Sequence, residues 1–123
     1  MNLKTIVIVI AQPDCFRESI QVLLTSIPLI DEIIPIESIN EAMRLATMIK
    51  PAIVILDSQV ANLDLPDMLK LIGDVWQEAS RIILLEDRNE FQQVTAYGAD
   101  TVLLKGFTVS RFIDEIEKVL VDR

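Results

Sequence analysis

Four short apolar runs in this sequence end directly at residues whose side chains could line a site. The runs span 5–10, 52–56, 81–85 and 101–104, and the residues that follow them are Ala11 and Gln12, Asp57 and Ser58, Glu86 and Asp87, and Lys105. Ligand chemistry in open α/β sheets gathers at the carboxyl ends of the strands, near the point where the strand order reverses. We therefore expect a site built around acids and one lysine, in which Lys105 forms an ion pair with Asp57 or Glu86.

The composition excludes several other kinds of chemistry. The chain has no histidine and a single cysteine, so the usual zinc, haem and histidine-base sites are disfavoured and no internal disulfide can form. We expect Cys15 to be a small buried apolar side chain rather than a reactive thiol. The three glycines are isolated, so no phosphate-binding glycine loop is present. A net charge of -8 opposes direct binding of nucleic acid, whose affinity for proteins comes largely from Lys and Arg.

The length and hydropathy pattern favour one domain away from the membrane. A chain of 123 residues fits a single domain, which we place at 1–123. Its apolar runs hold four to six residues, whereas a membrane span needs about 20. The N-terminal residues lack the features of a secretory signal, so we expect a cytoplasmic protein.

The elements that must position these residues alternate between strands and helices. The four apolar runs are hydrophobic on both faces, which is typical of buried parallel strands. A fifth strand is expected at 32–36, at an edge of the sheet, because Pro35 cannot donate to a ladder. Amphipathic helices are expected at about 16–27, 39–49, 64–76, 90–97 and 109–120.

Capping residues mark several helix ends. Asp14, Ser38 and Asp64 stand where an N-cap would lie, and Ser38 forms an S-x-x-E capping box with Glu41. Gly98 suits a left-handed C-cap. Five alternating strand and helix units predict a flavodoxin-like, doubly wound (βα)5 three-layer sandwich of class α/β, with parallel strands in the order 2-1-3-4-5.

Over its whole length the sequence resembles the receiver domains of bacterial two-component response regulators. The segment 51–57 (PAIVILD) is similar to the family's third strand, which ends in the aspartate that accepts a phosphoryl group. The segment 98–105 (GADTVLLK) is similar to its fifth strand, which ends in a lysine. The resemblance implies that Asp57 occupies the phospho-acceptor position and Lys105 the position of the lysine.

The same resemblance implies further positions, and at these the sequence departs from the family. The acidic pair that holds Mg²⁺ corresponds to Ala11 and Gln12, the Ser or Thr hydroxyl after the fourth strand to Glu86, and the aromatic switch residue to Val102. Mg²⁺ is normally bound through carboxylates together with phosphate oxygens, so we expect no metal site, or a weak one at Asp57 helped by Asp14. The ionised Glu86 cannot donate a hydrogen bond to a phosphoryl oxygen and would repel it.

These departures predict an atypical receiver, or pseudo-receiver, that regulates a partner or an output domain by protein contact, without Mg²⁺-dependent phosphorylation and without enzymatic activity. The resemblance implies contact through the helix at 90–97, the strand at 101–104 and the helix at 109–120. A histidine kinase, an output domain such as a transcription regulator, or a second copy could be the partner. Two alternatives stay open: a working phosphoacceptor that uses Asp57 and Mg²⁺, and a small flavodoxin-like protein that binds an organic ligand.

Overall fold

Five short strands form one parallel sheet in the order β2-β1-β3-β4-β5, as the sequence predicts. The structure is a computed structural model that describes residues 4–60 and 64–122. Its strands are β1 (Ile6–Ile10), β2 (Glu32–Ile36), β3 (Ile53–Asp57), β4 (Ser80–Leu85) and β5 (Thr101–Leu104). Its α-helices are α1 (Cys15–Thr25), α2 (Ile39–Leu45), α3 (Leu65–Val75), α4 (Phe91–Ala96) and α5 (Val109–Val121). The predicted flavodoxin-like fold is confirmed.

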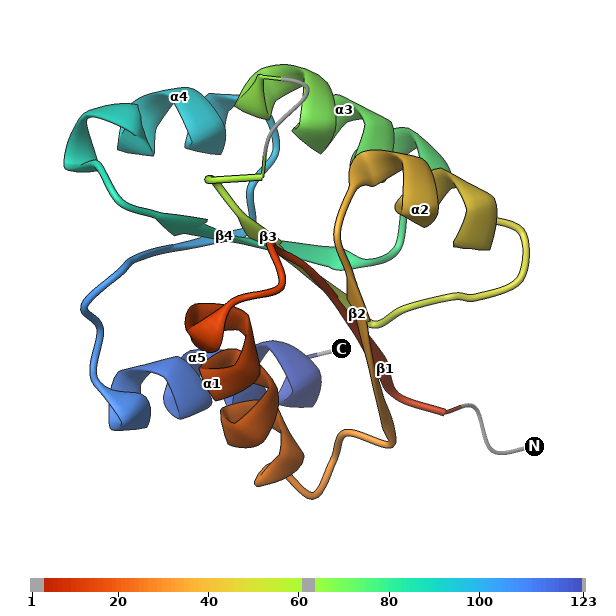
Figure 1. Ribbon diagram of the computed structural model, residues 1–123, viewed down its shortest axis with the longest axis vertical. Coiled ribbons are helices and arrows are strands. Elements are labelled where there is room, and N and C mark those ends of the chain that lie inside the picture. Colours follow the sequence, from red (N-terminus) through yellow and green to blue (C-terminus); the bar gives the residue numbers. More distant parts are fainter. Residues whose placement is uncertain (1–3, 61–63, 123) are drawn as a thin grey trace.

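The helices form a layer on each face of the sheet (Figure 1): α1 and α5 on one face, and α2, α3 and α4 on the other. Alternate residues of the central strands supply the two cores. Ile8, Val54 and Ile83 belong to the core beneath α2, α3 and α4, whereas Val7 and Ile53 belong to the core beneath α1 and α5. This period of two explains why the central strands are apolar throughout. Among the described residues, no helix is both long and apolar enough to cross a membrane.

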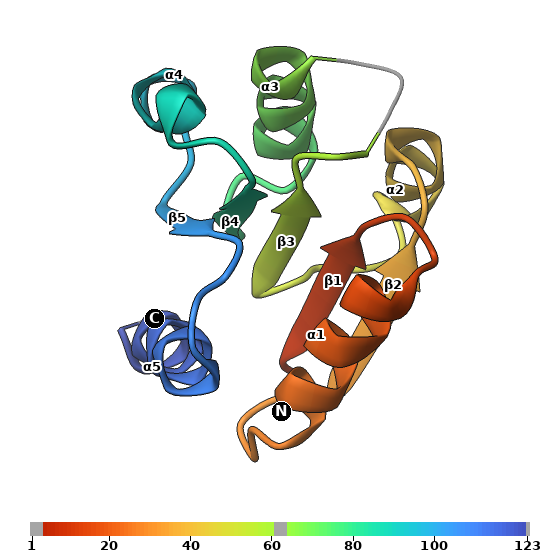
Figure 2. The ribbon, with the colours of Figure 1, turned by 60° about the vertical axis from the view of Figure 1, so that its left-hand side comes forward.

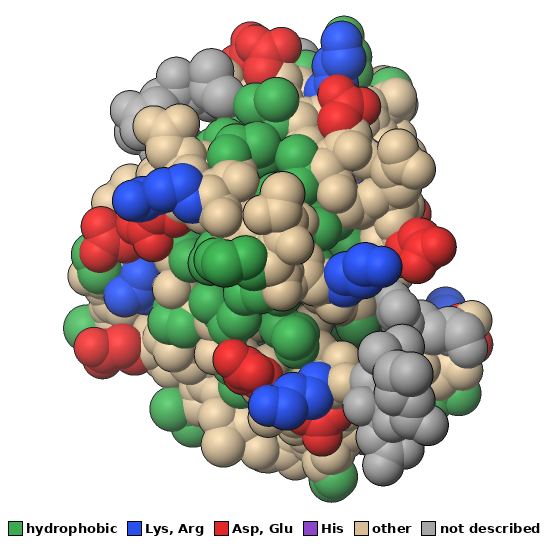
Figure 3. All heavy atoms as spheres, turned by 90° about the vertical axis from the view of Figure 1, so that its right-hand side faces the viewer, with side chains coloured by type: hydrophobic (Ala, Val, Ile, Leu, Met, Phe, Trp, Pro, Cys, Tyr) green, Lys and Arg blue, Asp and Glu red, His purple; other side chains and the backbone are tan. Residues whose placement is uncertain are grey.

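The strand that contains proline lies at an edge, as predicted. The Glu32 N–H donates to Thr5 and the Ile36 carbonyl accepts from Ala11, so the even-numbered residues of β2 bond to β1. Pro35 therefore has its missing N–H on the free edge, where it removes a donor that another strand could use. Figure 3 looks onto this side of the molecule and shows hydrophobic side chains gathered at its centre, with charged side chains around them.

The helix caps follow the sequence closely. The side chains of Asp14, Ser38 and Asp64 each accept a hydrogen bond from a backbone N–H three residues later, which confirms these N-caps. The helix expected at 39–49 is shorter than predicted, since α2 ends at Leu45 and single turns follow it. A 3-10 turn at Arg88–Glu90 precedes α4.

The prediction for Cys15 is wrong, because its side chain is exposed on the first residue of α1. The helical periodicity of 16–27 does not extend reliably to a residue next to the cap. The core face of α1 instead uses Ile20 and Leu24.

Gly98 follows α4 with a φ of 106°, which confirms the predicted left-handed C-cap. It also makes room for a neighbour from β4, since a Cβ at Gly98 would lie 2.8 Å from Nη1 of Arg81. That nitrogen donates to the carbonyl of Leu69 in α3. Arg81 thus connects β4 to α3. A glycine at position 98 suits both the left-handed backbone there and the space that the Arg81 guanidinium occupies.

Gly98→Ala is expected to lower the free energy of unfolding by about 2 kcal/mol, of which about half is the left-handed backbone and the rest the displaced Arg81 hydrogen bond. Gly106→Ala is the matched control, because Gly106 has a φ of 99° and no atom within 4 Å of an added Cβ. Urea denaturation of both variants measures the difference. Equal losses of stability would show that Arg81 moves aside without cost.

Candidate functional site

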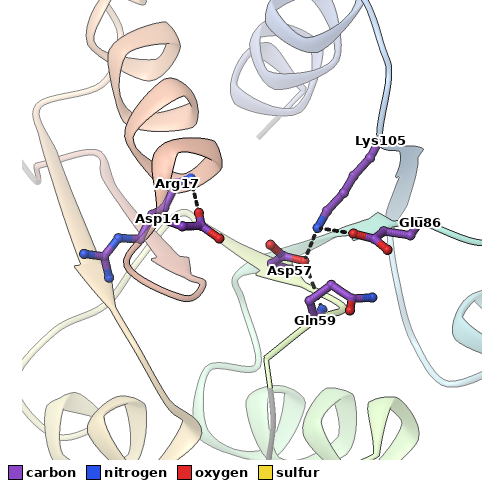
Figure 4. Close-up of polar contacts among 6 residues, drawn as sticks. All are labelled: Asp14, Arg17, Asp57, Gln59, Glu86 and Lys105. Atoms are coloured by element: carbon purple, nitrogen blue, oxygen red, sulfur yellow. Dashed lines mark hydrogen bonds and ion pairs between the residues drawn. The ribbon is translucent and has the colours of Figure 1, made fainter.

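Asp57 is the last residue of β3 and is buried, with 3% of its surface exposed. Its Oδ1 forms an ion pair with Nζ of Lys105 at 2.8 Å and accepts a hydrogen bond from the backbone N–H of Gln59 at 3.0 Å (Figure 4). The carboxyl ends of β1 and β3 point to the same end of the sheet (Figure 2). Asp57 therefore lies at the switch point between β1 and β3, where the sequence predicts the site.

Lys105 follows β5 and reaches across to Asp57 over the end of β4, whose Leu85 carbonyl accepts its backbone N–H at 2.7 Å. Its Nζ lies 3.4 Å from Oε1 of Glu86 and 4.6 Å from the ring centroid of Phe16. The expected ion pair is confirmed, and Lys105 pairs with both acids rather than with one. An ammonium bound to two carboxylates and an aromatic face is held in one position.

Glu86 forms the outer side of this arrangement. Its side chain is 55% exposed, compared with 4% for that of Asp57. Solvent screens the Glu86 contact, which therefore contributes less than the buried pair. Its carboxylate is turned toward Lys105 (Figure 4), so it stands as a second anion beside Asp57 and offers no hydrogen-bond donor.

Phe16, which lies against Lys105, belongs to a cluster of three phenylalanines that sequence reasoning missed. The ring of Phe107 lies 6.4 Å from that of Phe16 and 5.3 Å from that of Phe112. The cluster joins the start of α1, the β5–α5 connection and α5. Phe107 comes two residues after Lys105 in sequence, but only the packing of α1 against α5 brings Phe16 to the lysine.

The end of β1 provides no carboxylate for Asp57. Ala11 is 2% exposed and packs into the core beneath α1 and α5, and Gln12 is exposed. Asp14 accepts a hydrogen bond from the Arg17 N–H at 3.0 Å, so the preference for helix capping over metal binding agrees with its geometry.

Arg17 lies on α1, where a charged side chain is expected to face solvent. It is half-buried, and its guanidinium donates to the carbonyl of Ala11 at 3.4 Å. Its Nε is buried without a hydrogen-bond partner. The guanidinium points away from Lys105 in Figure 4, so it adds no charge to the Asp57 site.

The residues present do not fit a Mg²⁺ ion. Within residues 4–60 and 64–122, no group of three or more His, Cys, Asp or Glu residues could hold a metal. The Oδ1 atom of Asp57 already receives an ammonium group, and neither Ala11 nor Gln12 offers an anionic oxygen. Val102, to which the resemblance assigns the position of the aromatic switch residue, is a half-buried aliphatic side chain packed on the core beneath α2, α3 and α4.

Solved structures similar to this one are receiver domains. The receiver domain of an HD domain-containing protein from Pseudomonas fluorescens aligns with a TM-score of 0.85 at 16% identity, covering 98% of this chain and 97% of that one. A LuxR-family two-component response regulator from Aurantimonas also gives 0.85, at 18% identity, covering 98% of this chain and 88% of that one. The chain has the receiver-domain fold.

Another similar structure is longer than this receiver-like chain. The response regulator RcsB of Salmonella typhimurium, studied for its interaction with DNA, aligns with a TM-score of 0.83 at 13% identity. The alignment covers 98% of this chain and 61% of RcsB. No protein-family model and no curated protein sequence matches the chain. At such low identity the likeness describes the fold, and the function has to be argued from the site.

Proposed function

We propose that this protein is an atypical receiver that regulates a partner or output domain by contact, without Mg²⁺-dependent phosphorylation of Asp57. The observation that carries the proposal is the end of β1, where a core alanine and an exposed glutamine follow the strand, at positions that the resemblance assigns to the family's acidic pair. Phosphoryl transfer depends on positioning and on charge neutralisation around the transferred group. With Ala11 and Gln12 at the end of β1, the site offers few anionic ligands to the divalent ion that would supply most of that neutralisation.

Glu86 adds a second argument. A phosphoryl group on Asp57 would compete with Glu86 for Lys105, whose Nζ now contacts both acids. Two unit charges about 4 Å apart repel by roughly 4 kcal/mol at an effective dielectric near 20, before further screening by the solvent that reaches Glu86. The carboxylate therefore opposes the modified state, where a hydroxyl would stabilise it.

The resemblance implies contact through α4, β5 and α5, and the position of Lys105 supports it. The residue joins the β4–α4 connection, through Glu86, to the β5–α5 connection that it begins. Both connections lead into the helices on either side of β5. In this proposal the ion pair holds this face in one arrangement, so the signal depends on whether the partner is present.

Intact-mass measurement after incubation with acetyl phosphate and Mg²⁺ tests the proposal. We expect no stoichiometric addition of a phosphoryl group, because the site does not hold the metal ion that the reaction requires. A receiver that has the full acidic set is treated in parallel to show that the donor is active. Stoichiometric addition to the wild type that is lost in Asp57→Asn would contradict the proposal.

A further inference from the structure

Two adjoining hollows form a groove along the free edge of β5. One, of about 510 Å³, lies toward α4, and the other, of about 250 Å³, lies toward the start of α5. Both are lined by Phe91 and Leu104, so they adjoin each other at these two residues. We call this surface the β5 groove and define it by six of its lining residues: Arg88, Phe91, Val102, Leu104, Phe107 and Arg111. In Figure 2, β5 lies between α4 and α5 at the edge of the sheet.

The floor of the groove is apolar. Phe91 is 44% exposed, although it is a large hydrophobic side chain at the start of α4. Val102, Leu104 and Phe107 are half-buried. An exposed aromatic ring beside half-buried aliphatic side chains is the kind of surface that buries an apolar anchor of a partner.

The charged side chains of the groove are all cationic. Arg88 and Arg111 are exposed, and neither has an ion-pair partner among the residues that the structure describes. Lys105 also lines the groove but is already paired with Asp57 and Glu86. Neither hollow has an acidic lining residue, although the chain carries a net charge of -8.

A hollow at the opposite end of β4 and β5 has mostly acidic side chains, so cations and acids are separated along these strands. The hollow at the amino ends of β4 and β5 is lined by four acids, Glu78, Asp100, Glu115 and Asp122, with Lys118 as its single cation. The molecule thus places unpaired arginines beside an apolar floor at one end of β5 and acids at the other. Arginine is well suited to pair with carboxylates through two parallel hydrogen bonds.

We infer that the β5 groove binds an acidic segment of a partner protein, with an apolar side chain against Phe91 and Leu104 and carboxylates paired with Arg88 and Arg111. This inference rests on the proposed function, because it gives the chemistry of the partner that the contact face recognises. Nucleic acid is the wrong class of anion for a chain of net charge -8, since the overall field repels it. A peptide segment presents few charges and can approach the arginines locally.

Binding of a labelled peptide tests the inference on the unphosphorylated protein. The probe is a fluorescein-labelled dodecapeptide of Asp and Glu with a central Phe-Leu pair, followed by anisotropy and by amide chemical shifts. We expect saturable binding with shifts at Phe91, Val102 and Leu104, and weaker binding as salt increases. Arg88→Glu/Arg111→Glu is expected to weaken binding at least fivefold, because each site changes from attraction to repulsion.

The controls distinguish binding in the β5 groove from a general effect of the protein's net charge. Arg44→Glu/Lys70→Glu changes two exposed cations on α2 and α3 by the same amount and is expected to bind normally. A peptide with lysines around Phe-Leu, and an acidic peptide with Gly-Ser at its centre, are both expected to bind weakly. No binding of the acidic probe, equal binding of the lysine peptide, or equal loss in both double variants would overturn the inference.

Two further outcomes are informative. Concentration-dependent dimerisation that Arg88→Glu/Arg111→Glu abolishes would overturn the inference in favour of a second copy as the occupant. The peptide measurement does not use phosphodonor or Mg²⁺. The peptide measurement can therefore contradict the inference about the β5 groove without contradicting the proposal that Asp57 is not phosphorylated, which the mass measurement tests.

Discussion

Lys105→Met is expected to lower the free energy of unfolding by about 3 kcal/mol, because it leaves the buried carboxylate of Asp57 without its ion-pair partner. In the wild type, Asp57 Oδ1 receives Nζ of Lys105 at 2.8 Å, and the Asp57 side chain is only 4% exposed. In the variant, the backbone N–H of Gln59 remains the only donor to that oxygen among the described residues. Methionine keeps most of the packing of the lysine stem, so the loss reports the charge. Urea denaturation at neutral pH measures it.

Two variants provide the comparison. Asp57→Asn is expected to cost less, about 1 kcal/mol, because Lys105 keeps Glu86, the Phe16 ring and partial exposure to solvent. Lys4→Met breaks the Lys4–Glu32 pair, whose side chains are 70% and 46% exposed, and is expected to change stability by less than about 0.5 kcal/mol. If Lys105→Met costs no more than Lys4→Met, the pair at the site is not a structural element.

Ala11→Asp/Gln12→Asp/Glu86→Thr is expected to create a Mg²⁺ site beside Asp57, where we propose that the wild type binds none. The two new carboxylates would lie at the end of β1 beside Asp57, and the change at 86 removes the competing anion and adds a hydroxyl. Metal that binds only the folded protein stabilises it, by about 1.4 kcal/mol at ten times the Kd. We expect millimolar Mg²⁺ to raise the Tm of the variant and to leave that of the wild type unchanged.

A matched variant controls for charge. The triple variant adds two acids and removes one, so its net charge changes by -1; Gln77→Asp makes the same change at an exposed position in the connection between α3 and β4 and is expected to show no Mg²⁺-dependent rise in Tm. Ala11 is 2% exposed, so the triple variant should be less stable than the wild type without metal. A Tm of the wild type that rises with millimolar Mg²⁺ as much as that of the triple variant would show that the native site already binds the ion.

The fold could be predicted from the sequence because the residues that indicate each strand and helix lie close together in the chain. The apolar runs within β1, β3 and β4 are hydrophobic on both sides because both faces of the sheet are covered, and Pro35 identifies β2 as an edge strand. The caps at Asp14 and Ser38 act within three residues and were predicted correctly. The end of α2 was predicted at residue 49, but the helix ends at Leu45. Ile49 continues the hydrophobic pattern of a helix although the chain is no longer helical there.

The site was only partly accessible in this way. The pairing of Lys105 with an acid was predicted, since both residues lie at the carboxyl ends of parallel strands. The contact between Lys105 and the ring of Phe16 was not predicted, and neither was the hydrogen bond from the guanidinium of Arg17 to the carbonyl of Ala11. Both depend on how α1 lies against the sheet, and helical periodicity indicates a buried face without giving the reach of a long side chain.

The sequence by itself determined the order of the elements, the parallel sheet and the absence of acids at positions 11 and 12, because these depend on residue type and on periods of two and 3.6 residues. Only the tertiary structure decided that one lysine serves Asp57 and Glu86 together, and that Arg88 and Arg111 adjoin an apolar floor. Such arrangements join segments about 20 to 50 residues apart, and their distances are set by the packing of helices on a twisted sheet.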